Sequence, residues 1–341
     1  MASNNTLTGW DNMWMYTMYI VQGVVIGGSN LLIATTIVHY EALRSRKEYA
    51  MITAQAFADG LNQMGYLCAG IYRIYLVLSG QFSTKLTPWE CQTKPHALLW
   101  IWTDPTSNLM LTIVSGDRLM AVFRPLDYIG WPVSYTWRVI AVTYLYNICI
   151  ALLGNLAIFF DRKHQQPVCL AVCYTNAVLG QAGYPGYKDY FEKTSPIFAT
   201  TSIVIYALVL LKFKWKQNLF AGDTLERKQE MHIQRKLTTS IGLSSLCTLL
   251  LSVLPMQLGF LMVDLGIDHW GLVAFIMSNF NPFCNVIIYP IRHRDLREGV
   301  VALIKRKTMP HNLIAWKDNR TAQQNLKHEV YFAVEVCCMW W

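Results

Sequence analysis

The chain has 341 residues, of which 53% are hydrophobic and only 15% are charged, and it carries a formal net charge of +8 at pH 7. This balance argues against an ordinary soluble protein of one or two domains. It also disfavours nucleic-acid binding, because the basic residues lie in short segments between long apolar runs rather than in one basic tract. The sequence therefore predicts a protein that is solvated largely by the lipid bilayer.

Seven apolar runs follow one another along the chain, each near the length of about 20 residues that a helix needs to cross a bilayer. A segment can span lipid only if its backbone hydrogen bonds close within a helix or a sealed barrel, and these runs lack the alternation of barrel strands. The expected fold is thus all-α, a bundle of seven transmembrane helices. The runs lie at 14–39, 50–78, 96–121, 137–160, 195–213, 237–263 and 270–290.

The segments between the runs differ in character. The segment 161–194 contains several Gly and Pro residues and is expected to be irregular or hairpin-like. The segment 212–236 is rich in charged residues, which favours an extension of the fifth and sixth helices beyond the bilayer. After the seventh run, the apolar residues fall on one helical face, which predicts an amphipathic helix on the membrane surface. The expected divisions are 1–13, 14–290, 291–307 and 308–341.

The distribution of basic residues predicts the orientation. With the amino terminus outside, 22 of the 29 Lys and Arg residues lie in inner segments and six in outer ones, as the positive-inside rule requires. No cleavable signal peptide precedes the first run, so this run is expected to act as its own signal. Asn4 lies in a glycosylation sequon on the predicted outer side. The sequence thus predicts a multi-pass plasma-membrane protein with an extracellular amino terminus.

Three of the nine cysteines, Cys91, Cys169 and Cys173, fall in predicted outer loops. That compartment is oxidising, so one disulfide among the three is expected. The sequence alone leaves the pairing open.

Four motifs occur in a fixed order. They are Gly28-Ser29-Asn30-Leu31-Leu32, Ala56-Phe57-Ala58-Asp59-Gly60-Leu61, the string from Asp117-Arg118 to Pro125-Leu126-Asp127-Tyr128, and Asn285-Val286-Ile287-Ile288-Tyr289. Together they resemble the rhodopsin-like (class A) family of seven-transmembrane G-protein-coupled receptors. Leu119 and Val286 depart from the Asp-Arg-Tyr and Asn-Pro-x-x-Tyr motifs of that family, which suggests a divergent invertebrate branch such as the worm serpentine-type chemoreceptors.

The resemblance implies a receptor that binds an extracellular ligand within the helix bundle and activates a heterotrimeric G protein, with no enzymatic activity. The alternative is an ion-coupled membrane carrier or channel that uses Asp59 and Asp104 as an ion path. That alternative is disfavoured by the lack of the inverted repeats common in transporters. The expected partners are a G protein, a ligand and the lipid bilayer, and the expected cofactor is none, apart from a sodium ion.

The resemblance also implies residue roles. Asp117, Arg118 and Tyr289 are expected to form the G-protein switch. Many family members hold the Arg with a second acid on the sixth helix, but the matching residue here is Arg235. The resting state is therefore expected to depend mainly on Asp117.

A polar pocket at mid-membrane is expected from Asn30, Asp59, Ser107, Asn281 and Asn285. Asp59 and Ser107 would bind the sodium ion, or the pocket would be a purely structural hydrogen-bond network through Asn30, since an isolated buried carboxylate is costly.

The expected ligand contacts are Tyr72, Arg73, Trp100 and Asp104, each with an alternative. Arg73 either snorkels to the membrane interface or contacts an anionic ligand, with snorkelling favoured. Asp104 either faces the ligand or caps the local backbone beside Pro105. The aromatic residues either line the ligand cavity or pack. In the family, the first outer cysteine bridges to the second outer loop, so Cys91 is expected to pair with Cys169 or Cys173, with Cys173 slightly favoured.

Overall fold

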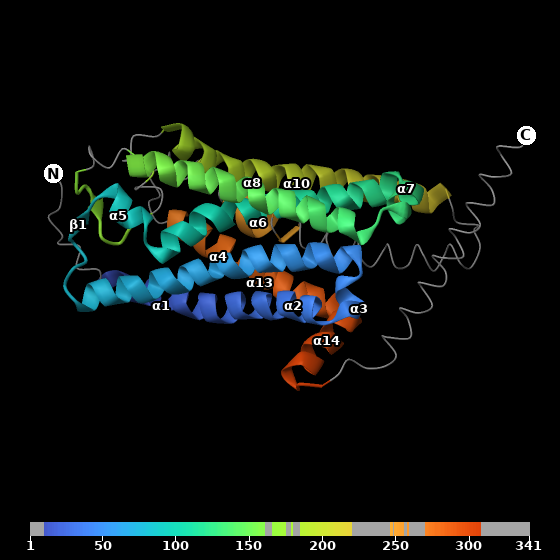
Figure 1. Cartoon of the computed structure of the whole chain (residues 1–341), viewed down its shortest axis with the longest axis horizontal. Coiled ribbons are helices and arrows are strands. Elements are labelled where there is room, and N and C mark those ends of the chain that lie inside the picture. Colours follow the sequence, from blue (N-terminus) through green and yellow to red (C-terminus); the bar gives the residue numbers. More distant parts are fainter. Residues whose placement is uncertain are drawn as a thin grey trace, which may run out of the picture.

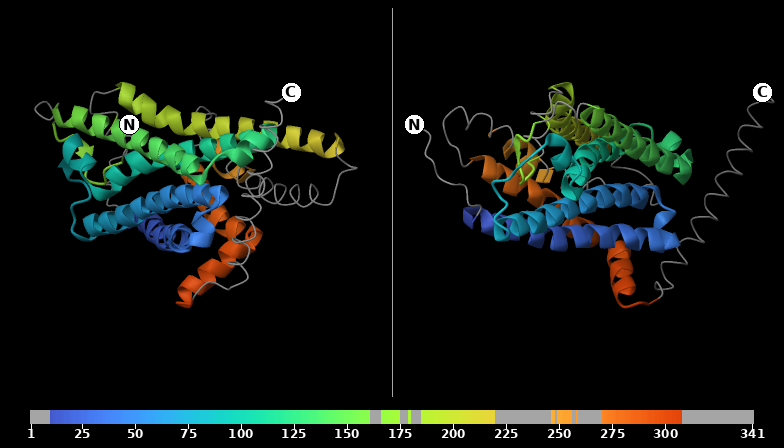
Figure 2. Two further views of the ribbon diagram at one scale, coloured as in Figure 1. Left: turned by 45° about the vertical axis from the view of Figure 1, so that its right-hand side comes forward. Right: turned by 60° about the vertical axis from the view of Figure 1, so that its left-hand side comes forward.

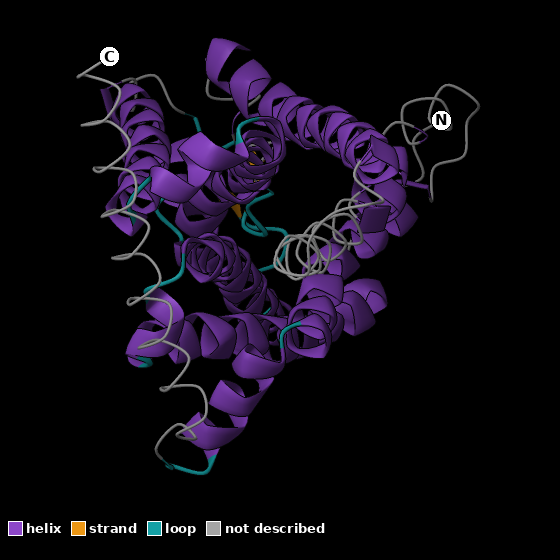
Figure 3. Cartoon of the chain, turned by 90° about the vertical axis from the view of Figure 1, so that its right-hand side faces the viewer, coloured by secondary structure: helices purple, strands orange, loops and turns teal. Residues whose placement is uncertain are grey.

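The structure is a computed structural model, and its long helices run side by side (Figure 1). Seen end-on, the helices form a closed bundle rather than a layer (Figure 3). The structure describes residues 10–160, 166–174, 179, 185–219, 246–247, 249–255, 258 and 270–307. Asn4, Arg235, the segment 308–341 and most of the expected sixth run lie outside the described residues.

The first apolar run forms α1 (Met13–Gln22), the π-helical η2 (Gly23–Gly27) and α2 (Gly28–His39) without a break, preceded by the short η1 (Trp10–Asn12). Glycines allow this helix to approach α4 (Lys47–Leu78) closely. A Cβ atom on Gly23 would lie 2.5 Å from the Cβ of Leu67, and one on Gly27 would lie 2.8 Å from the terminal methyl of Met64. Larger residues at these positions would push the two helices apart.

The remaining long helices are α6 (Pro95–Phe123), α8 (Val133–Phe160), α10 (Pro185–Leu219) and α13 (Trp270–Arg292). Part of the expected sixth span appears as η4 (Leu249–Val253). By length and composition alone, three described segments could cross a membrane, namely Met13–His39, Val133–Phe160 and Lys193–Lys212. α4 and α6 fall short of that measure because they carry buried polar residues on the faces they turn toward each other.

The fifth apolar run agrees with the candidate span Lys193–Lys212, but α10 begins earlier, at Pro185, within the segment 161–194 that was expected to be irregular. Tyr187 and Phe191 continue the helix and pack against the apolar cluster of Ile101, Ala151 and Ile158. Charged residues between these aromatics lowered the hydropathy of the segment and concealed a helix that is buried on one face only.

Short elements close the two ends of the bundle. α3 (Glu41–Arg44) and α7 (Pro125–Gly130) lie at one end, hereafter the Arg118 end. At the opposite end, hereafter the disulfide end, β1 (Lys85–Leu86) and α5 (Pro88–Gln92) lie beside β2 (Cys169–Leu170). β1 and β2 pair as antiparallel strands. The two strands belong to different loops, whereas the hairpin-like structure was expected within the segment 161–194.

The amphipathic helix expected after the seventh span is confirmed as α14 (Arg294–Ile304). It turns away from the end of α13 instead of continuing along the bundle (Figure 2). Leu296 on its apolar face is fully buried, whereas Ile304 is 64% exposed. An ion pair between Arg46 and Asp295 at 2.7 Å holds the start of α14 against the loop before α4.

Candidate functional site

Asp59 lies at the centre of a hydrogen-bond network that joins three helices. Its carboxylate is 2% exposed on α4. It accepts a hydrogen bond from the Ser107 hydroxyl on α6 and another, at 3.2 Å, from the side-chain amide of Asn285 on α13. Three of the five residues expected in the polar pocket therefore meet.

Asn30 and Asn281 have other positions. Asn30 is fully buried, but its amide donates to the carbonyl of Ile26 in its own helix, at 3.0 Å. Asn281 is half-buried one turn before Asn285 on α13. Among the described residues, no hydrogen bond joins Asn30 to Asp59, so the alternative of a network through Asn30 gains no support from this arrangement.

The sequence reasoning missed Gln55, which lies one turn before Asp59 on α4. Its amide nitrogen is 3.0 Å from a carboxylate oxygen of Asp59 and 3.2 Å from the Ser107 hydroxyl. The side chain is 3% exposed. The available signal was the spacing, because residues four apart on a helix share a face. A polar side chain at that spacing from a buried acid is a candidate partner.

These donors bear on the expected sodium ion. A sodium ion needs oxygen lone pairs pointing inward, whereas two amide nitrogens and a hydroxyl here point their hydrogens at the carboxylate of Asp59. The three donors satisfy the buried charge without a cation. The arrangement as described does not fit the ion, and sodium linkage remains a prediction that requires Gln55 and Asn285 to reorient.

At the Arg118 end, Arg118 is 5% exposed and is held on one side by its neighbour Asp117. The guanidinium Nε lies 3.0 Å from the Asp117 carboxylate. Tyr128 of α7 completes the cluster, since its hydroxyl accepts from Arg118 at 2.7 Å and donates to Asp117 at 3.0 Å. Tyr128 is part of the motif that begins at Asp117, but the motif alone did not predict that its hydroxyl contacts Arg118 and Asp117.

Lys47, the first residue of α4, also holds Tyr128 in place. Its ammonium lies 2.6 Å from the backbone oxygen of Tyr128 and 4.6 Å from the centre of the ring. Burial raises the pKa of the Tyr128 hydroxyl, so this group keeps its proton and remains a donor. Tyr289, the third expected switch residue, is 4% exposed and packs in the apolar cluster that contains Ile37, Leu43 and Leu296. The structure therefore places it apart from the cluster of Asp117, Arg118 and Tyr128.

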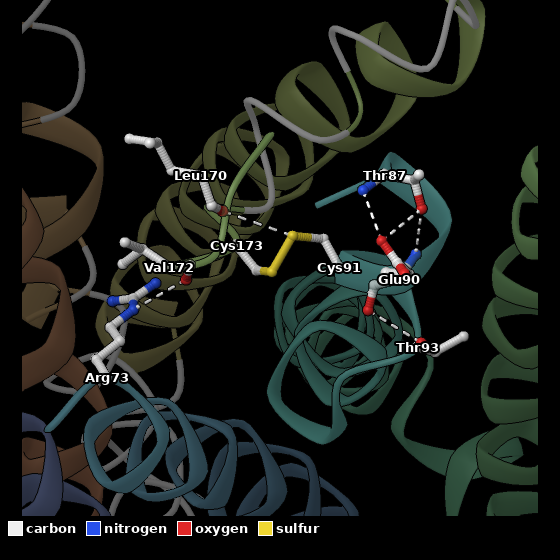
Figure 4. Close-up of a disulfide and its surroundings, with 8 residues drawn as sticks. All are labelled: Arg73, Thr87, Glu90, Cys91, Thr93, Leu170, Val172 and Cys173. Atoms are coloured by element: carbon white, nitrogen blue, oxygen red, sulfur yellow. Dashed lines mark hydrogen bonds between the residues drawn. A yellow bond between two sulfur atoms is a disulfide. The ribbon is translucent and has the colours of Figure 1, made fainter. Parts of the chain in front are cut away.

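A disulfide links Cys91 and Cys173 at the disulfide end (Figure 4), as expected. Cys169 lies beside it as a buried thiol that is not part of the disulfide. Cys91 belongs to α5, whose first turn is closed by a capping box between Thr87 and Glu90. A break separates α5 from α6, which starts at Pro95. This break places Cys91 on a separate short helix rather than on α6.

Arg73 does not snorkel to the interface, and the favoured expectation for it was wrong. The residue is only 2% exposed. Four aromatic rings surround its guanidinium at 4.7–5.9 Å, from Tyr16, Tyr19, Trp100 and Tyr174. Its Nε also lies 3.3 Å from the carbonyl oxygen of Val172, next to the disulfide (Figure 4). Rings from two helices and a loop therefore replace the interfacial water that snorkelling would require.

The other expected ligand contacts lie near Arg73 or deeper in α6. The Tyr72 ring is 5.4 Å from the ring of His96, which in turn is 5.5 Å from Trp100. Asp104 accepts a hydrogen bond from the Ser195 hydroxyl on α10 at 2.6 Å. Its carboxylate thus joins α6 to α10, and local backbone capping, one of the two alternatives for Asp104, is wrong.

Comparison with known proteins agrees with this geometry. The sequence model of the family described as serpentine type 7TM GPCR chemoreceptor Srsx matches residues 23–266. Adenosine receptor A2b of Mus musculus is 22% identical over 320 residues, which cover 87% of this chain and 91% of that receptor. The family confirms the seven-helix bundle and the absence of an enzymatic role. With its fold, its disulfide and this match over most of its length, the chain belongs to the Srsx family of serpentine seven-transmembrane G-protein-coupled chemoreceptors.

Proposed function

We propose that the protein is a plasma-membrane receptor with an extracellular amino terminus, which binds a ligand near the disulfide end and activates a heterotrimeric G protein at the Arg118 end. The observation that carries this proposal is the buried cluster of Asp117, Arg118 and Tyr128. An arginine that is 5% exposed needs a reason to be kept at the end of a transmembrane helix, because an apolar residue would cost less there.

The cluster is suited to a two-state switch. In this arrangement Arg118 uses its donors on Asp117 and Tyr128, both near the same end of α6. A movement of α6 or α7 that separates these groups would expose the guanidinium to a partner protein. A ligand would then act by binding the separated arrangement more tightly, which shifts an existing equilibrium.

The Asp59 network would couple the two ends. It joins α4, α6 and α13 through Ser107 and Asn285, so a relative shift of these helices must break or exchange at least one hydrogen bond. Ligand contact would come from Tyr72, Arg73, Trp100 and Asp104. The division into 1–13, 14–290, 291–307 and 308–341 remains part of this proposal, with Asn4 as the glycosylated residue of the first part.

Nucleotide exchange tests the proposal. The full chain in lipid nanodiscs is incubated with each of a panel of purified G proteins, and GTP-analogue uptake is followed without added ligand. We expect basal uptake on at least one G protein, because Arg235 occupies the position of the second acid that holds the arginine in many family members. The resting state would then depend mainly on Asp117. Arg118→Ala should abolish the uptake while the variant still folds and reaches the cell surface. Failure of every G protein to respond, or equal uptake with Arg118→Ala, would contradict the coupling.

A further inference from the structure

The guanidinium of Arg73 lies in an aromatic box made by Tyr16, Tyr19, Trp100 and Tyr174. The nearest ring is that of Tyr174, at 4.7 Å. The box keeps the cation away from water, since the whole residue is 2% exposed. The attraction between the cation and the ring faces offsets part of the cost of burying the charge.

The positive charge has no acidic partner in the part of the chain that the structure describes. The ion pairs formed there involve Arg46, Arg118, Arg124 and Arg294, all at or near the Arg118 end. Arg73 has five N–H donors, of which one donates to Val172, and Tyr19 lies within hydrogen-bonding reach of the guanidinium. The described contacts therefore leave part of the planar donor edge, and the charge itself, uncompensated.

Two further basic side chains lie beside the box. His96 is 1% exposed, and its Nε2 has no hydrogen-bond partner among the described residues. The ammonium of Lys94 lies 5.3 Å above the ring of Tyr72, at the start of α6. Arg73 and Lys94 give this corner of the disulfide end a positive charge, which attracts anions, whereas the buried His96 imidazole is neutral and offers a hydrogen-bonding nitrogen.

Tyr174 is also the most accessible wall of the box. It is 41% exposed, whereas the adjoining Val172 and Cys173 are buried. The disulfide fixes the neighbouring Cys173, so a turn of the exposed Tyr174 ring is the movement that we expect to admit a ligand. A ligand can thus reach the cation without unfolding the loop.

We propose that the Arg73 box is the recognition site for the acidic group of a small organic anion, specifically a carboxylate attached to a flat or apolar body. The planar edge of an arginine matches a carboxylate with two parallel hydrogen bonds. The rings of Tyr16, Tyr19 and Trp100 provide faces for the apolar body. This inference rests on the proposed receptor function, because it names the chemical class of the ligand.

Matched acids and amides test the site. The full chain in nanodiscs, without G protein, is heated with benzoate, phenylacetate, indole-3-acetate or decanoate, and in parallel with the primary amide of each acid. We expect one or more acids to raise the unfolding temperature in a saturable way, and the amides to have no effect. Arg73→Gln should weaken the apparent affinity roughly ten- to hundredfold, as for loss of a charged hydrogen-bonding group.

Two further variants control the test. Arg138→Gln removes the same charge from an exposed position on α8 and should leave acid binding unchanged. Arg73→Lys keeps the charge in the box but not the planar edge, and should bind the acids with intermediate affinity even if Arg73→Gln does not fold. The proposal is overturned if no acid stabilises the protein, if amides match the acids, or if either Arg73 variant binds like the original. If basal nucleotide exchange occurs but no acid binds, the proposed site is wrong and the proposed G-protein coupling stands. If acids bind but no G protein responds, the site stands and the coupling is wrong.

Discussion

At the scale of single residues, the protein buries charges by surrounding each with donors or rings. Asp59 has three donors, Arg118 has an acid and a phenol, and Arg73 has four aromatic rings. Each of these arrangements uses groups from more than one helix, so each depends on the relative positions of the helices. Removing a single partner should therefore alter function before it alters the fold.

Removal of the Tyr128 hydroxyl should raise basal signalling. In Tyr128→Phe the ring stays beside Lys47, but Arg118 and Asp117 each lose a hydrogen bond of 2.7 and 3.0 Å, respectively. Hydrogen bonds to charged groups contribute about 1.5–3 kcal/mol, enough to change the resting population by roughly tenfold or more. Basal nucleotide exchange should rise in Tyr128→Phe and in Asp117→Asn. Tyr135→Phe, a change at an exposed tyrosine, is the matched control. Unchanged exchange in both cluster variants would show that Arg118 is not held in this way.

Gln55 should determine whether sodium affects the receptor. With Gln55 donating to Asp59, sodium chloride and choline chloride at equal ionic strength should give the same unfolding temperature. In Gln55→Leu the carboxylate of Asp59 loses a donor, at a cost of about 1–3 kcal/mol. Sodium should then recover stability, and Asp59→Asn in the same background should abolish the effect. A sodium response of the unaltered protein equal to that of Gln55→Leu would contradict this account.

At the scale of elements, the sequence predicted the helices well and their side-chain partners poorly. Long apolar runs and ordered motifs located six described helical spans and α14, because the length of a span and the polar residues within it are local properties of the sequence. The start of α10 depended instead on packing against residues of other helices, and the burial of Arg73 on aromatic rings from α1, α6 and a loop. The contact of Tyr128 was missed for the same reason, because its partners lie on α6. Gln55 was missed although its partner Asp59 lies one turn away on the same helix.

The outer disulfide should stabilise the disulfide end through Cys91 and Cys173 only. The bridge closes a loop with a sequence separation of 82 residues, and loss of such a bond typically costs about 2–5 kcal/mol. Cys91→Ser and Cys173→Ser should each lower the unfolding temperature, and the double variant should be no worse than either one. Cys169→Ser, at the buried thiol outside the disulfide, is the control and should leave the bridge intact. Additive losses from the Cys91 and Cys173 variants would argue against the pairing.

The junction of α13 and α14 should be sensitive to acid through His293. Burial lowers the pKa of its imidazole to about 4, against an ordinary value of about 6.5. Between these values the unfolded chain binds more protons than the folded one, so stability is full above about pH 6.5 and falls as the pH drops toward 4. The unfolding temperature should decline over this range. His293→Phe keeps a ring against Tyr49, 5.6 Å away in the original, and should flatten the decline. An equally steep decline in His293→Phe would assign the effect to other groups.

At the scale of the whole molecule, the proposal requires the two ends of the bundle to face different compartments. The disulfide end carries an oxidised cysteine pair and a half-exposed aromatic wall over Arg73. The Arg118 end carries the ion pairs of Arg46 and Arg118 and leads into the basic segments around α14. A disulfide persists in an oxidising compartment, and basic loops stay in the cytoplasm. Both arguments favour a disulfide end outside the cell, as the proposal requires, and they are independent of each other.

Epitope tags should reveal this orientation. A tag inserted after Asn4 should bind antibody on intact cells, whereas a tag inserted at residue 225, within the segment 212–236, should bind it only after permeabilisation. The reason is the excess of basic residues, 22 on the predicted inner side against six on the outer. Asn4→Gln should also abolish a glycosidase-sensitive shift in electrophoretic mobility, which can arise only in the lumen of the secretory pathway. If the first tag stained permeabilised cells alone and the second stained intact cells, the chain would be inverted. Arg118 would then face away from every cytoplasmic G protein, and the proposed coupling would be physically impossible whatever the cluster at its side chain.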